Sequence, residues 1–137
     1  MTPLPPLAPT SAVNADEPYG GRDPAHDLYA YAAGLLANAQ ALEAAADDPA
    51  TVAALAPTLA CAETSLAALA RATSRLRVHA LRRLTDPVLG ADEDTARHRA
   101  EIAAALERVA GVLDQGSFAC TRAREAIDPV VDELTAL

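Results

Sequence analysis

The chain has 137 residues and a net charge of −8 at pH 7, and it contains 35 Ala and 18 Leu but only three Tyr, one Phe and no Trp. This composition is too apolar for a chain disordered throughout and too poor in β-branched and aromatic residues for a β-sandwich. Two cysteines cannot staple a disulfide scaffold, and the chain has no uncharged apolar run of about 18 residues that would predict a membrane span.

The first 22 residues differ in composition from the rest of the chain. They hold five of the ten prolines and end close to Gly20–Gly21. We predict a disordered, Pro-rich tail over 1–22, followed by one helical domain over 23–137. The N-terminus has no positively charged start and its prolines interrupt any apolar core, so we do not expect a secretory signal. The predicted location is cytoplasmic, with Cys61 and Cys120 as reduced thiols of unassigned role.

The first predicted helix begins at Asp23–Pro24, because Asp accepts hydrogen bonds from free N–H groups and Pro suits the first helical position. We expect it to end near Asp47. A second start signal stands at Asp48–Pro49, and Pro57 is expected to end or kink the short turn that follows. The apolar residues of the first helix recur at helical spacing and are Leu28, Ala32, Leu35, Ala39, Leu42 and Ala46.

A second long helix is predicted to end at Leu84, with a break over Asp86–Gly90. Its apolar positions are Leu59, Ala62, Leu66, Leu69, Thr73, Leu76 and Ala80. A third helix begins at the acidic residues Asp92–Asp94, where the helix dipole favours negative charge, and stops at Gln115–Gly116. Its apolar positions are Ile102, Leu106, Val109 and Leu113.

The last predicted helix is capped by Ser117 and is kinked or restarted at Asp128–Pro129. Its apolar positions are Cys120, Ala123, Ile127, Val130, Leu134 and Leu137. Four apolar seams joined by short loops predict an all-α fold, an antiparallel helical bundle of about four helices. Because Ala alternates with Leu, the predicted core is thin, and association with a second copy or a partner would bury more of it.

The charges are distributed unevenly along the chain. Residues 64–85 contain five Arg, one His and no acidic residue. In a helix, Arg71, Arg75, His79 and Arg82 fall within about 80° of one another. One interpretation is a solvated surface screened by the acidic helices. The other is a binding surface for anions, either on an acidic protein or on nucleic acid, since guanidinium groups bind carboxylate and phosphate.

The other candidate contact residues are Tyr29 and Tyr31, which either anchor an interface or pack at the end of the bundle core. We predict no catalytic residues, no metal site and no cofactor. The acidic clusters stand at predicted helix ends, where capping explains them. A di-iron bundle needs Glu-x-x-His on two helices, and the chain contains no such motif.

These observations predict a non-catalytic helical protein–protein interaction module that self-associates, docks an acidic partner, or does both. The alternative is a small nucleic-acid-associated regulator that binds through the Arg-rich helix surface. The salt dependence of binding distinguishes a protein partner from nucleic acid, because the affinity for phosphates falls steeply as the salt concentration rises. No aromatic residue stands near the Arg-rich surface to stack on bases, which disfavours single-stranded nucleic acid. No membrane association is expected.

Overall fold

The computed structural model describes residues 23–85 and 92–136, and over these ranges it is all-helical, with no strand. The predicted all-α class is therefore confirmed. The predicted tail over 1–22 and the predicted break over Asp86–Gly90 lie outside the described residues. The chain divides into two compact units, Met1–Thr51 and Val52–Leu137, and each is described by itself. A single helical domain over 23–137 stays a prediction.

The first unit contains helix α1, Pro24–Ala45, which begins where the sequence predicts. The Asp23 Oδ1 accepts hydrogen bonds from the backbone N–H groups of Ala25 and His26, at 3.1 and 3.3 Å. Pro24 occupies the first helical position, where its missing N–H breaks no helical hydrogen bond. The start and approximate end of this helix are confirmed.

A short 3-10 helix, η2, Pro49–Ala54, precedes helix α2, Leu55–Leu84. The Asp48 Oδ1 accepts a hydrogen bond from the Ala50 N–H at 2.9 Å, so the second start signal is confirmed. The prediction for Pro57 is wrong, because this residue lies inside the first turn of α2. Backbone N–H groups of a first turn have no intrahelical acceptor, and Pro is therefore tolerated there.

Helix α3, Glu93–Ile127, is 35 residues long and begins where predicted. The Asp92 Oδ1 accepts a hydrogen bond from the Thr95 N–H at 2.7 Å and caps the helix. The predicted stop at Gln115–Gly116 is wrong, because α3 passes through these residues without a break. The predicted third and fourth helices are therefore one helix.

Contacts with α2 explain why α3 does not stop there. A Cβ added at Gly116 would lie 3.3 Å from Leu66 Cδ1, so the glycine permits a close approach of the two helices. The Ser117 hydroxyl donates a hydrogen bond to the Glu63 carbonyl oxygen at 2.8 Å instead of capping a new helix. Both residues serve the packing between α2 and α3.

The C-terminal end bends at Asp128–Pro129, as predicted, through the 3-10 helix η4, Asp128–Val130, into the short helix α4, Val131–Thr135. Pro removes a backbone donor and ends the preceding α-helical ladder. The described ranges thus contain three long helices and three short helical segments. This differs from the predicted bundle of about four helices.

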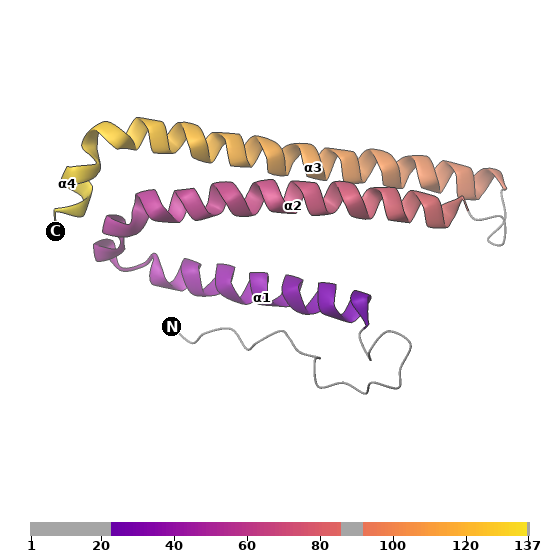
Figure 1. Cartoon of the computed structure of the whole chain (residues 1–137), viewed down its shortest axis with the longest axis horizontal. Helices are drawn as coiled ribbons and strands as arrows, with labels where there is room; N and C mark the ends of the chain where they lie inside the picture. The colour runs from indigo at the N-terminus through magenta and orange to yellow at the C-terminus, as the bar shows by residue number, and fades with distance from the viewer. Residues whose placement is uncertain (1–22, 86–91, 137) are drawn as a thin grey trace. The chain divides into compact units, whose positions relative to one another are not determined.

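In the second unit, α2 and α3 lie side by side and antiparallel along most of their length (Figure 1). The less exposed residues of both helices recur at alternating spacings of three and four, and we call them the seam. On α2 the seam comprises Leu59, Glu63, Leu66, Ala70, Thr73, Arg77, Ala80 and Leu84. On α3 it comprises Arg99, Ala103, Leu106, Ala110, Leu113, Ser117, Cys120 and Ile127.

The seam differs from the predicted one at alternate positions. At Leu69, Leu76, Ile102 and Val109 the less exposed residue is the one that follows, so the structure moves these four predicted residues out of the seam. Ala62 and Glu63 are both partly exposed, and Glu63 belongs to the seam because its carbonyl oxygen accepts a hydrogen bond from Ser117 of α3. Small residues such as Ala70 and Gly116 allow the helix backbones to approach, so they occupy the contact and leave larger side chains beside it.

The interior of the hairpin is thin. Ala70 is the one hydrophobic residue that is buried in the described ranges, and none of the large side chains there is fully buried. Two helices packed as a single layer can cover only one strip of each other's surface. Much of the apolar surface of the hairpin therefore stays exposed.

Candidate interaction surface

A polar cluster fixes the relative position of α2 and α3. Glu63 forms an ion pair with Arg124, and its backbone carbonyl oxygen accepts the Ser117 hydroxyl. Hydrogen bonds from Arg124 and then Thr121 hold the pKa of the Glu63 carboxyl below its usual range. A one-residue slip would separate these groups, so the cluster specifies one antiparallel register.

Stability should fall in acid partly because of Glu63. Its lowered folded-state pKa means that its stabilising contribution is complete above the unfolded value, about 4.3 for Glu, and is lost as the pH falls through the folded value. The backbone N–H of Thr95 lowers the pKa of Asp92 in the same direction. We expect Glu63→Gln to lower the urea midpoint at pH 7 and to lower it progressively less as the pH falls below about 4.3. A shift that stayed the same as the pH fell would contradict this role.

An open, shallow groove runs along one side of the hairpin. Its polar side chains come from both helices, and most of them directly follow a seam residue. We call it the polar groove, and its lining includes Arg71, Ser74, Arg75, Glu107, Gly111 and Asp114. In the described part of the chain, none of its four charged side chains forms an ion pair within 4.0 Å.

The opposite side of the hairpin is apolar along its middle. Residues that directly precede seam positions lie there on both helices, since residues that follow the seam line the polar groove. We call the apolar part of this side the apolar face, and it comprises Ala62, Leu69, Leu76, Ile102, Val109 and Val112. The last four are exposed. The sequence analysis assigned most of these residues to a buried core. The polar residues that the same rule places on this side include Ser65, His79, Arg83 and His98, and the last three lie beyond Leu76 and Ile102.

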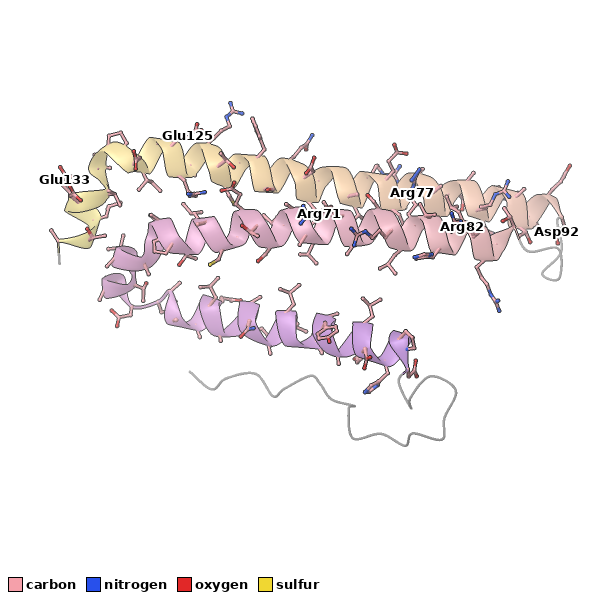
Figure 2. All side chains as sticks on the ribbon, viewed as in Figure 1. Arg71, Arg77, Arg82, Asp92, Glu125 and Glu133 are labelled. Atoms are coloured by element: carbon pink, nitrogen blue, oxygen red, sulfur yellow. The ribbon has the colours of Figure 1, made fainter. Side chains whose placement is uncertain are left out.

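The four residues of the predicted Arg-rich surface, Arg71, Arg75, His79 and Arg82, are all exposed on α2. The structure divides them, because Arg71 and Arg75 line the polar groove and the other two do not. Figure 2 shows Arg71 midway along α2 and Arg82 toward the end where Asp92 lies.

Two acidic side chains belong to the surroundings of the Arg residues. Glu107 and Asp114 of α3 line the polar groove together with Arg71 and Arg75. The sequence analysis missed them, because it considered the charge pattern of α2 without the helix packed against it. The groove is therefore mixed in charge rather than basic.

Tyr29 and Tyr31 lie in the first turns of α1, with exposed fractions of 73% and 53%. Both side chains are therefore exposed within the first unit, and the choice between an interface anchor and packing at the end of a bundle core stays a prediction. α1 belongs to the first unit, so these two residues are not combined with the hairpin into one site.

Arg77 is a seam residue that the sequence analysis did not single out. It lies where α2 meets α3 (Figure 2), and its Nε is buried without a hydrogen-bond partner. The aliphatic part of an Arg side chain can cover apolar surface while its charged end reaches water. Arg77 thus adds a long side chain to a part of the seam where its neighbours on α2, Thr73 and Ala80, are small.

The remaining chemical groups do not converge. Cys61 and Cys120 are free thiols, one exposed and the other partly exposed. Within 23–85 and 92–136, no group of three or more His, Cys, Asp or Glu side chains is placed to hold a metal ion. No protein-family model matches the chain, and no curated protein or solved structure is significantly similar to it.

By length and composition alone, the segment Pro49–Leu84 is apolar enough to cross a membrane. Its apolar part is the first half, where Glu63 is the single charged residue between Val52 and Ala70. The second half carries the five Arg. Helices of soluble proteins can pass the same test, so the expectation of no membrane association stays a prediction.

Proposed function

We propose that this chain is a non-catalytic helical interaction module that binds a helical partner through the apolar face of the α2–α3 hairpin. One observation carries the proposal: exposed apolar side chains of two helices gather on the same side of the hairpin. A contiguous apolar patch of this kind is typical of an interface. Two further helices docked there would complete an antiparallel bundle of four.

The Arg-rich surface has a secondary role in this proposal, as a polar contact for an acidic protein partner. Nucleic acid is the alternative partner. The presence of Glu107 and Asp114 beside Arg71 and Arg75 disfavours it, because carboxylates in the same groove repel phosphate. The net charge of −8 acts in the same direction over longer distances.

A capture experiment tests both the binding surface and the class of partner. Tagged full-length chain is incubated with lysate, with and without nuclease, and bound proteins are quantified. The variant Val112→Glu puts a charge on the apolar face. Its matched control is Phe118→Glu on the other side of α3, because the two side chains have similar exposed fractions, 65% and 62%.

We expect Val112→Glu to reduce recovery of the bound protein by at least about tenfold, since a desolvated charge at an interface costs more than 1.4 kcal/mol. Phe118→Glu and nuclease treatment should leave recovery unchanged. Recovery lost with nuclease and with Arg71→Glu/Arg75→Glu/Arg82→Glu would favour nucleic acid. Recovery that is equal for both α3 variants would contradict the apolar face as the binding surface.

A further inference from the structure

We infer that the occupant of the apolar face is a second copy of this chain, with α2 of each copy lying on α3 of the other. This inference rests on the proposed function and names its partner. It requires a face that is complementary to itself, because a twofold interface uses the same surface on both subunits. Three features of the hairpin meet this requirement: its area, its two-helix shape and its charge pattern.

The side of the hairpin that carries the apolar face is large enough for a stable dimer. α2 has 30 residues, which corresponds to about 45 Å. Two packed helices, each about 10 Å across, are about 20 Å wide, so this side measures roughly 900 Å², with the apolar face along its middle. A standard protein interface buries about 800 Å² on each partner. A single 22-residue helix such as α1 is shorter than this side, whereas a second hairpin matches it in length and width.

The face contains both large and small side chains. Leu69 stands seven residues after Ala62 on α2, and Val112 stands seven residues after Ala105 on α3. When two such faces meet, large side chains of one copy can enter the spaces beside small side chains of the other. This favours interdigitation over a flat contact.

The charge pattern selects one of two twofold arrangements. Beyond the residues of the polar groove, residues 78–85 of α2 contain two Arg and no acid, whereas residues 92–102 contain four acids and two Arg. Both segments lie at the same end of the hairpin (Figure 2). A twofold axis parallel to the helices sets α2 on α3 at this end, so opposite charges meet. An axis perpendicular to the helices would instead set the Arg-rich half of α2 against its nearly uncharged half.

Single residues at the edges of the face follow the same logic. Glu101 directly precedes Ile102 on the outer edge of α3, and Arg82 occupies the outer edge of α2. The contact of Leu66 with Gly116 sets the register and puts Arg82 and Glu101 within one helical turn of the same level. The parallel axis therefore brings Arg82 next to Glu101 of the second copy.

Arg75 provides a matched control for Arg82. It lies seven residues before Arg82 on α2, and it lines the polar groove on the side opposite the apolar face. Charge reversal at these two Arg residues should therefore have different effects on the dimer.

Sedimentation equilibrium of the full-length chain at low salt tests the inference. We expect a mass of twice 14.1 kDa, with dissociation at lower protein concentration. Val112→Glu should weaken the dimer at least about tenfold, and Phe118→Glu should change the dissociation constant less than about twofold. Circular dichroism checks that each variant keeps its helix content.

Charge reversals then test the arrangement. Arg82→Glu alone and Glu101→Arg alone should each weaken the dimer about threefold, since two exposed pairs are lost in each. An equimolar mixture of the two variants should restore it, because each mixed dimer regains opposite charges at both edges. Arg75→Glu should change the dissociation constant less than about twofold, because Arg75 lines the polar groove on the other side of the hairpin, although it changes the net charge as much as Arg82→Glu does.

The outcomes separate the inference from the proposed function. A chain that is monomeric at every concentration overturns the second copy, and the proposed function survives if a different protein is captured in a Val112-dependent manner. If the chain is monomeric and captures no protein in a Val112-dependent manner, both the inference and the proposed function are overturned. The occupant of the apolar face that would then be tested is α1 of the same chain. A dimer that responds to Phe118→Glu and not to Val112→Glu, or a mixture that fails to recover, also overturns the inference.

Discussion

Phe118→Pro should destabilise the hairpin by about 3 kcal/mol or more, because the new residue would stand inside a continuous helix. Proline at this position removes the hydrogen bond to the carbonyl of Asp114 and its ring collides with that carbonyl. The structure places Phe118 in the middle of α3, exposed, with the Arg122 guanidinium 5.5 Å from its ring centre. Urea unfolding followed by circular dichroism measures the effect.

The matched control is Phe118→Ala, which removes the same exposed ring. Loss of the contact with Arg122, about 0.5–1 kcal/mol, should be nearly offset by the better helix propensity of Ala. The experiment separates two folds. If a helix ended at Gly116 and a new one began after Ser117, proline at position 118 would occupy a first helical position and be tolerated. Equal stability of the Pro and Ala variants would therefore argue for a break.

Leu66→Asp should destabilise the hairpin by about 2–4 kcal/mol, from lost apolar burial together with a charge placed at a helix contact. Leu66 lies against Gly116, where even a single Cβ on the glycine would be only 3.3 Å from Leu66 Cδ1. The new carboxylate would also stand one turn from Glu63, so like charges would repel. Because so thin a hairpin is marginally stable, we expect a large loss of helix content at 25 °C.

Val78→Asp is the control for Leu66→Asp. Val78 is an exposed apolar residue of the same helix and does not belong to the seam. The change in stability should stay within about 0.5 kcal/mol, the range of ordinary surface substitutions. Similar losses for both variants would show that the seam is wrongly assigned.

Local signals were sufficient to predict where the helices start. Asp23, Asp48 and Asp92 each accept a hydrogen bond from a backbone N–H two or three residues further along, as their sequence context predicts. The C-terminal bend at Pro129 is equally local. Such features depend on a few neighbouring residues, so they can be predicted without knowledge of the packing.

Gly116 shows where local signals were insufficient. Glycine is common just beyond a helix end, but it also permits close approach of two helices. Gly116 permits the close approach of α2 and α3. The spacing of the apolar residues held the information needed, because Leu113 and Cys120 are seven residues apart and keep one helical phase across the glycine. The helical phase of the apolar residues was therefore a better predictor of the continuous helix than the glycine was of a helix end.

The candidate surface was predictable only in part. The exposure of Arg71, Arg75, His79 and Arg82 follows from charge and helical period, which the sequence contains. The acidic neighbours of two of them could not be inferred, because Glu107 and Asp114 come from a helix at least 32 residues further along. The charge of a groove depends on which two helices line it.

By itself, the sequence determined the all-α class, the helix starts at Asp23, Asp48 and Asp92 and the Arg-rich character of α2, since each depends on residues within a few turns. Only the tertiary structure decided which apolar residues form the contact between α2 and α3. The helices meet through small residues such as Ala70 and Gly116. This close approach turns Leu76 and Val109 outward, to the exposed face that we propose as the binding surface.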